Sequence, residues 1–209
     1  MVCTFFGHRE CPELKPYIRA VLEELIIHHN VDTFLVGSSG QFDRQVRSVL
    51  KQLSQELPHI RYAVVLAYMP GNRRQEEESS DTMLPEEIER THPKFAIDKR
   101  NRWMLDQADY VVTHICHSWG GAWKYAEIAR KKQKSVYNID KDNPASLPMP
   151  ILQRILANDA WGLYPLSLDD VLTISGTVAR QMREAGLITE ESCRKARERF
   201  EENMKRYMD

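Results

Sequence analysis

The chain has 209 residues, of which 42% are hydrophobic and 28% are charged, and this length suffices for one generous domain with a sizeable core. With 9 Gly and 10 Pro, the composition excludes a fibrous, low-complexity or mainly disordered protein. Because 29 Lys and Arg balance 30 Asp and Glu, the formal net charge is -1, which excludes a global positive field that would drive unspecific binding to nucleic acid or to an anionic membrane.

The first residues and the cysteines indicate the compartment. Residues 1–9 lack the basic and apolar regions of a secretory signal, and no apolar run approaches the length of a membrane span. The cysteines at positions 3, 11, 116 and 193 show no C-x-x-C spacing, so reduced thiols are expected. We therefore expect a cytoplasmic protein without membrane association.

Strands and helices are predicted to alternate along the first 140 residues. Short apolar runs predict strands over 2–6, 33–36, 61–68, 110–115 and 135–139, and apolar residues at helical spacing predict helices over 12–29, 42–57, 97–107 and 122–132. Elements in this alternation form an open, mainly parallel sheet with helices on both faces. The predicted fold class is therefore α/β and Rossmann-like.

Two other parts of the chain have a different pattern. The polar stretch 72–94 predicts a long loop with one helical turn at 85–90. Beyond Asp140, prolines mark a linker, and the helices predicted over 168–185 and 189–208 form a hairpin with Gly186 as the first helix stop. The sequence thus predicts a Rossmann-like domain over 1–140, and a linker with a helical C-terminal extension over 141–209.

Three predicted strands end in loops that contain glycine. These loops are Gly7-His8-Arg9, Gly37-Ser38-Ser39-Gly40 and Ser118-Trp119-Gly120-Gly121. Ligands of open parallel sheets bind beyond such strand ends, where glycine lets the backbone approach a phosphate and the next helix offers free N–H groups. The set predicts a phosphate-binding site, although a tight turn explains any single loop.

The spacing of the glycines and histidines argues against several common kinds of nucleotide-binding and metal-binding site. Neither G-x-x-x-x-G-K-[ST] nor G-x-G-x-x-G occurs, which argues against a P-loop nucleoside triphosphatase and a standard dinucleotide dehydrogenase. His28 and His29 point to different faces of a helix, and no i, i+4 histidine pair is present. We therefore expect no cofactor and no metal ion.

Four stretches in chain order form a set of motifs. They are Phe6-Gly7-His8-Arg9, Gly37-x-x-Gly40-x-Phe42-Asp43-Arg44, Arg100-Asn101-x-x-Met104 followed by Ala108-Asp109, and Gly120-Gly121 with Lys124-Tyr125-Ala126. This set resembles the SLOG superfamily, named for the Smf/DprA and LOG proteins, and more closely its YpsA-like branch. The resemblance covers about residues 1–140. It implies a Rossmann-like domain that holds a nucleotide or a nucleotide-derived molecule.

The LOG branch also implies an enzymatic activity, cleavage of the N-glycosidic bond of a nucleoside monophosphate. Its catalytic Arg and the Glu of its P-G-G-x-G-T-x-x-E motif fall by position on Arg100 and Glu127. A carboxylate can stabilise the oxocarbenium-like ribosyl centre, while a guanidinium holds phosphate. However, Trp119 replaces the Pro of the motif, and Trp123-Lys124 replace its Gly-Thr. These departures favour binding without turnover, because a Trp can stack on a base and Lys124 can neutralise a phosphate.

Single candidates also have purely structural interpretations. His8 can contact a phosphate or ribose, or can merely hydrogen-bond its own loop. Asp43 can bind ribose hydroxyls, or can serve as a first-turn acid that favours the helix dipole. Glu127, one turn into an amphipathic helix, is also typical of a solvated surface residue.

Three functions follow as alternatives. The one we expect is a sensor or sequestering module for an ADP-ribose-like molecule or nucleoside phosphate, in a homodimer or higher homo-oligomer. Its ligand-binding residues are predicted to be Gly7, His8, Arg9, Gly37, Ser38, Ser39, Gly40, Asp43, Arg100, Ser118, Trp119, Gly120, Gly121 and Lys124. The second is a nucleotide N-glycosidase with Arg100 and Glu127 as catalytic residues. The third is a module for single-stranded nucleic acid with Arg44, Arg47 and Lys51 as a basic stripe, against which the balanced charge argues.

Overall fold

The computed structural model, which describes residues 1–68, 82–195 and 197–198, divides the chain into two units, Met1–Pro165 and Leu166–Asp209. The first unit continues past residue 140 because helix α6 (Met149–Ala160) packs on helix α1 (Lys15–His29). Between these helices, Arg154 Nη2 contacts Glu24 at 3.2 Å and Asn158 donates to Glu23 at 2.9 Å. The domain boundary that the sequence predicts at 140 therefore lies inside the first unit.

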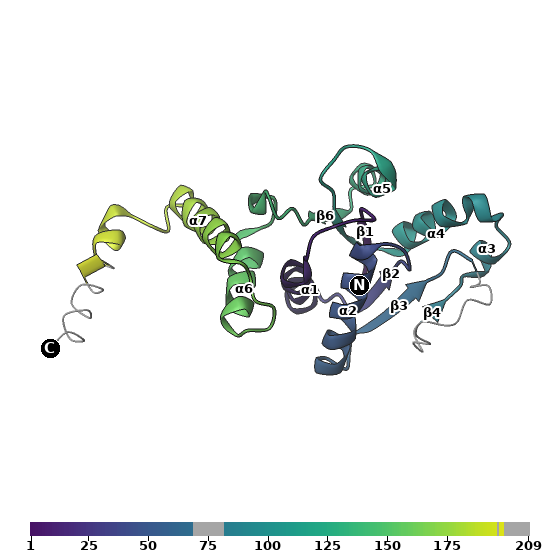
Figure 1. Ribbon diagram of the computed structural model, residues 1–209, viewed down its shortest axis with the longest axis horizontal. Coiled ribbons are helices and arrows are strands. Elements are labelled where there is room, and N and C mark those ends of the chain that lie inside the picture. The colour runs from purple at the N-terminus through teal and green to yellow at the C-terminus, as the bar shows by residue number, and fades with distance from the viewer. Residues whose placement is uncertain (69–81, 196, 199–209) are drawn as a thin grey trace. The chain divides into compact units, whose positions relative to one another are not determined.

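A parallel sheet with the order β4-β3-β2-β1-β5-β6 forms the centre of the described part of the first unit (Figure 1). Its strands are β1 (Val2–Gly7), β2 (Thr33–Val36), β3 (Arg61–Val65), β4 (Thr82–Met83), β5 (Tyr110–His114) and β6 (Ser135–Asn138). Every strand pair is parallel, and Gly7 of β1 lies opposite His114 of β5. The predicted α/β, Rossmann-like fold class is confirmed.

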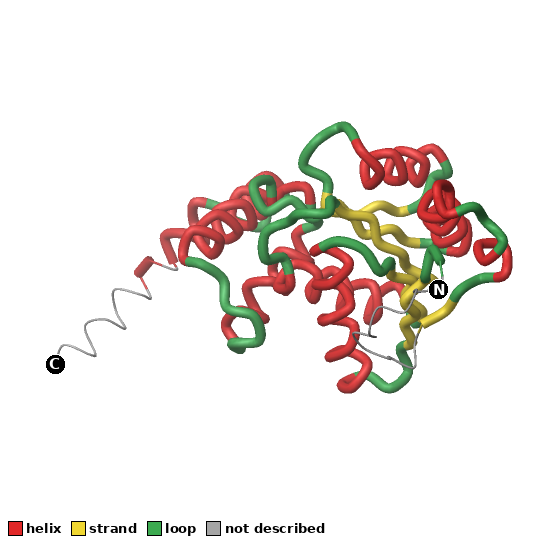
Figure 2. The backbone as a smooth tube through the Cα atoms, turned by 45° about the vertical axis from the view of Figure 1, so that its right-hand side comes forward, coloured by secondary structure: helices red, strands yellow, loops and turns green. Residues whose placement is uncertain are grey.

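Helices cover both faces of this sheet (Figure 2). The helices other than α1 and α6 are α2 (Gln41–Glu56), α3 (Glu86–Glu89), α4 (Pro93–Gln107) and α5 (Gly120–Lys131), and a 3₁₀ turn spans Pro144–Ser146. Helix α1 packs against both α2 and α6, whereas α4 packs against both α3 and α5. These two groups of helices enclose the sheet between them.

The side chains of β1 show how the core forms on both faces, since successive residues of a strand point to opposite sides. Phe6 stacks on Tyr125 of α5 at a centroid distance of 5.1 Å, and Phe5 lies beside Phe34 of β2 at 6.3 Å. All four side chains are buried, and each such side chain contributes roughly 1.5–3 kcal/mol to folding. The near-continuous apolar runs of the central strands thus reflect burial on both faces.

The structure differs from the sequence-based prediction mainly between β3 and α4. β3 ends at Val65, and the two-residue strand β4 was not predicted because it is too short to show a period. The predicted helical turn corresponds to α3, and α4 begins at Pro93, earlier than predicted, because the His92 side chain accepts a hydrogen bond from Lys94 N and caps the helix. Residues 72–81 of the predicted loop lie outside the described residues.

The second unit begins with helix α7 (Leu168–Glu184), whose first turn is capped by Ser167. Gly186 follows it with a φ of +71°, a conformation that glycine adopts without strain, so it ends the helix as predicted. Residues 190–195 and 197–198 are helical, and the remainder of the helix predicted to reach 208 lies outside the described residues.

None of the described helices is both long enough and apolar enough to cross a membrane.

Candidate functional site

A cleft of about 540 Å³ opens at the carboxyl ends of β1, β2 and β5. From β1 the chain proceeds through β2 and β3 to β4, and it then returns to place β5 on the other side of β1. The strand order therefore reverses between β1 and β5. Ligands of open α/β sheets bind at such a reversal.

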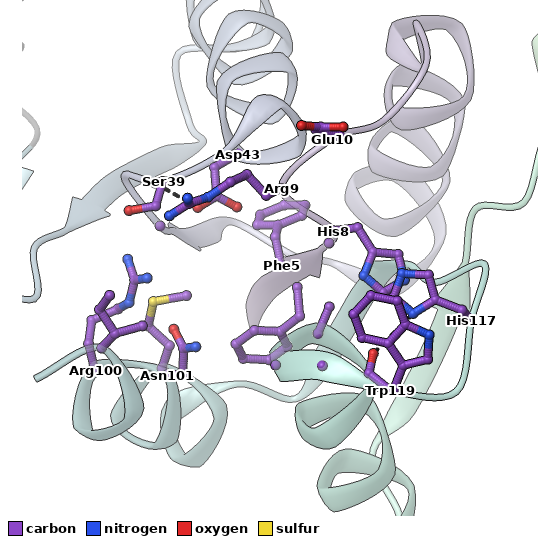
Figure 3. A pocket seen from close by; sticks show the side chains of 18 residues that line it. Phe5, His8, Arg9, Glu10, Ser39, Asp43, Arg100, Asn101, His117 and Trp119 are labelled. Carbon is purple, nitrogen blue, oxygen red and sulfur yellow. Dashed lines mark hydrogen bonds between the residues drawn. The ribbon is translucent and has the colours of Figure 1, made fainter. Parts of the chain in front are cut away.

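All three glycine-containing loops reach this cleft (Figure 3). Of the predicted ligand-binding residues, those that line it are Gly7, His8, Arg9, Gly37, Ser39, Asp43, Arg100, Trp119, Gly120 and Gly121. The remaining lining residues are Phe5, Phe6, Glu10, Ile97, Asn101, Met104, His117 and Ala122. The structure thus brings together most of the predicted set, from four separate parts of the chain.

Two of the glycines permit close packing at the base of the cleft. A Cβ atom on Gly7 would lie 2.3 Å from the Phe42 ring, and one on Gly37 would lie 2.3 Å from Asp43 Oδ2 and 2.8 Å from Arg100 Nη1. No side chain fits at either distance. These positions require glycine because of their neighbours in space.

Arg100 is the buried cation of the cleft. It lies on α4 with 4% of its surface exposed, and its Nη1 donates to the Val65 carbonyl at 3.1 Å. Burial lowers the pKa of the guanidinium, which the charge of Asp43 opposes, but an arginine side chain stays protonated in proteins. Its Nε is buried and has no hydrogen-bond partner among the described residues. Since an unsatisfied buried donor costs about 1–3 kcal/mol, this group is suited to an anion.

Asp43 is the buried acid beside Arg100. It lies in the first turn of α2, and its Oδ2 accepts a hydrogen bond from Ser39 N at 3.1 Å. Burial raises the pKa of its carboxyl to about 6, although the charge of Arg100, the Ser39 N–H and the charge of Arg47 all act to lower it. The charge of the cleft therefore changes just below neutral pH.

We expect the affinity of the cleft for sulfate to rise as the pH falls from 7 to 5. Ionised Asp43 repels an anion, so its protonation favours binding, by roughly twofold to fivefold between pH 7 and pH 5 for a coupling of about 0.5–1 pKa unit. Sulfate is the suitable probe because its own charge stays constant over this range. Isothermal titration calorimetry at both pH values measures the effect.

The variant Asp43→Asn is the control for this pH dependence. It should bind sulfate with a smaller pH dependence than the unmodified protein. Other titratable groups of the cleft lining, among them His8, account for the pH dependence that remains. An Asp43→Asn protein with the full pH dependence would exclude Asp43 as its origin.

An aromatic stack forms the other end of the cleft. The rings of His8 and His117 lie 3.6 Å apart, and those of His117 and Trp119 lie 3.9 Å apart with only 14° between their planes. His117 Nδ1 donates to the Trp119 carbonyl at 3.1 Å, which orients the imidazole. Trp119 is 68% exposed, so a large part of its ring is available to a further planar group.

Five predicted residues do not line the cleft. Lys124 pairs with Asp98, and Glu127 pairs with Arg130, each at 2.5 Å on the surface. Gly40, with a φ of +97°, directly precedes α2 as its N-cap and lies near the backbone of Arg9, while Ser38 and Ser118 are exposed. The structure therefore does not bring Glu127 to the cleft with Arg100, and a catalytic role of this pair stays a prediction.

Glu10, Asn101 and His117 are the polar lining residues of the cleft that were not among the predicted ligand-binding residues. Asn101 follows Arg100 directly within the motif, and this position could have identified it as a candidate site residue. His117 comes three residues after β5, at the same edge as His8, and only the pairing of β1 with β5 reveals their proximity.

No protein-family model and no curated protein matches this chain. The X-ray structure of DNA processing protein A (DprA) from Streptococcus pneumoniae matches with a TM-score of 0.50 and 16% sequence identity. The match covers 82% of this chain and 60% of that chain. At this identity the match shows a shared Rossmann-like fold, and membership of the SLOG superfamily or of its YpsA-like branch stays a prediction.

Proposed function

We propose that this protein binds a nucleotide or a nucleotide-derived small molecule, a nucleoside phosphate or an ADP-ribose-like compound, as a sensor or sequestering module. The observation that carries the proposal is the buried guanidinium of Arg100, whose Nε lacks a partner among the described residues and which lines a cleft at the strand-order reversal. A volume of about 540 Å³ lies within the usual range of small-molecule sites.

One end of the cleft is suited to phosphate. Arg100 supplies a buried cation, and the loop at Gly37 and Ser39 leads into the N-terminus of α2, where the helix dipole favours an anion. Guanidinium groups bind phosphate through paired, charge-assisted hydrogen bonds. Figure 3 shows Arg100 and Asn101 on one side of the cleft, with Arg9 and Ser39 across from them.

The other end is suited to a base. The stack of His8, His117 and Trp119 ends in the exposed ring of Trp119. Stacking of a base on an aromatic side chain contributes about 1–3 kcal/mol and tolerates any base. An anion-binding end and an aromatic end in one cleft match the two ends of a nucleotide.

Replacing Trp119 by alanine should separate these two ends. We expect Trp119→Ala to weaken binding of AMP and ADP-ribose by about 5- to 150-fold, which corresponds to the loss of stacking, and to leave ribose 5-phosphate nearly unchanged. Calorimetric titration with AMP, ADP-ribose, ribose 5-phosphate and adenosine gives the comparison.

Trp161→Ala is the matched control, because Trp161 is 81% exposed and does not line the cleft. It should retain the affinity of the unmodified protein for all four compounds. If none of them binds to the unmodified protein, the proposed function is wrong.

Products of the same incubations distinguish binding from turnover. We expect mass spectrometry to recover each nucleotide intact, since Glu127 is paired with Arg130 away from the cleft lining. Free base with ribose phosphate would favour the N-glycosidase instead. Retention of a single-stranded oligonucleotide that is lost in Arg44→Ala would favour the nucleic-acid module.

A further inference from the structure

Three side chains that can bind a metal ion meet beside the cleft. His8, Cys116 and His117 each offer one ligand atom, and these atoms all lie within 4.8 Å of one another. His8 and Cys116 are 108 residues apart in sequence. They meet because β1 and β5 pair with Gly7 opposite His114, so that the loops after both strands begin side by side. The sequence predicted no metal ion because this juxtaposition has no local spacing.

The local geometry allows these atoms to converge. Two ligands of a tetrahedral zinc ion, with bonds of about 2.0–2.3 Å, lie roughly 3.3–3.8 Å apart. Cys116 is exposed, so rotation of its side chain can close much of the remaining distance. The His8 Nε2 contact with Cys116 N is long, at 3.3 Å, and Cys116 N can turn to water when the imidazole turns to a metal ion.

The hydrogen bond of His117 also leaves one of its imidazole nitrogens available to a metal ion. A carbonyl oxygen only accepts, so the contact between His117 Nδ1 and the Trp119 carbonyl requires that Nδ1 carries the proton. The lone pair of His117 is therefore on Nε2. Metal-bound histidines typically donate their other N–H to a carbonyl in this way, which fixes the ring and its tautomer.

We infer that His8, Cys116 and His117 form a binding site for one Zn²⁺ ion with a fourth, open coordination position. Two imidazoles and one thiolate suit a borderline-soft ion of this kind, whereas Mg²⁺ and Ca²⁺ prefer oxygen. As the S–Zn bond forms, the thiol of Cys116 releases its proton to solvent. His8 and His117 bind as neutral imidazoles.

The zinc site borders the cleft in which we propose that the ligand binds. His8 and His117 both line the cleft, so the fourth ligand is water that an anionic oxygen of a cleft ligand can replace. The three-ligand site itself depends only on His8, Cys116 and His117 and does not require that a nucleotide binds.

Titration of the metal-free full-length protein with Co²⁺ tests the site without any nucleotide. We expect one equivalent to bind, with the intense visible bands of tetrahedral Co²⁺ and a thiolate-to-metal charge-transfer band, and we expect Zn²⁺ to displace it. In Cys116→Ser the charge-transfer band should disappear and the affinity for Zn²⁺ should fall by at least about 100-fold. Mutation of residues that only hydrogen-bond to metal ligands already lowers metal affinity by about 10- to 100-fold. His117→Ala should weaken Zn²⁺ binding similarly.

Cys193→Ser is the matched control, because Cys193 is also an exposed, free cysteine but lies in the second unit. It should leave the spectrum and the Zn²⁺ affinity unchanged. A charge-transfer band that survives in Cys116→Ser, or a wild-type protein with only the weak spectrum of octahedral Co²⁺, would overturn the inference. Nucleotide binding without metal uptake would overturn the zinc site and leave the proposed function intact. Metal uptake without nucleotide binding would support the zinc site and overturn the proposed function.

Discussion

Gly7→Ala is expected to destabilise the first unit by about 3 kcal/mol, the upper part of the usual range for overpacking a core. The added Cβ would lie 2.3 Å from two ring atoms of Phe42 and 2.7 Å from its Cβ. Phe42 is 1% exposed and its ring packs against that of His114, so it cannot move away freely. The backbone of Gly7 is held as well, because β1 lies between β2 and β5. Denaturant unfolding, compared at an unchanged m-value, measures the loss.

Gly121→Ala is the matched control for this substitution. Gly121 also lines the cleft, in the first turn of α5, but no atom of the described residues lies within 4 Å of the position that its Cβ would take. We expect a change between zero and a stabilisation of about 1 kcal/mol, because alanine restricts the unfolded chain. The double variant Gly7→Ala/Phe42→Leu should recover part of the stability, since the two sites are in contact. Equal stability of Gly7→Ala and Gly121→Ala would contradict the explanation.

Arg100→Met is expected to weaken binding of phosphate-bearing ligands by about 10- to 150-fold, the equivalent of one charge-assisted hydrogen bond of about 1.5–3 kcal/mol. It should also destabilise the protein by about 1.4 kcal/mol at pH 7, because the carboxyl of Asp43, whose pKa is about 6, then takes up a proton for lack of its buried cationic neighbour. Calorimetric titration and denaturant unfolding measure the two effects.

The loss of stability in Arg100→Met should depend on pH. The pKa of Asp43 is about 6 in the folded protein, against 3.8 for a solvated aspartate, so its ionisation opposes folding, and stability falls as the pH rises from about 4 to about 6. Arg100 lowers this pKa, and its removal raises it further. The free energies of unfolding of Arg100→Met and of the unmodified protein should therefore differ least near pH 4–5 and most above pH 7.

A second substitution separates the two roles of Arg100. Arg100→Met/Asp43→Asn removes the buried acid together with the buried cation, so it should recover much of the stability at neutral pH. Its affinity for phosphate-bearing ligands should stay low. If this double variant binds as tightly as the unmodified protein, Arg100 does not hold the ligand.

Much of the first unit could be predicted from local patterns. The strands of the sheet core and helices α1, α2 and α5 follow from apolar periods of two or of three to four, which a short window of sequence contains. The glycine-containing loops at Gly7, Gly37 and Gly120 mark the strand ends, and ends of parallel strands share one edge. Both the fold class and the position of the cleft therefore followed from the sequence.

The chemistry within the cleft was decided by contacts between distant segments. Asp43 is buried beside Arg100 because the first turn of α2 and the middle of α4 both border the cleft, and Glu127 turns instead to Arg130 on its own helix. His8 meets Cys116 and His117 because β5 pairs with β1. A local period predicts which element a residue belongs to, but burial, pKa and the approach of two side chains depend on strand order and packing. Only the tertiary structure determines these.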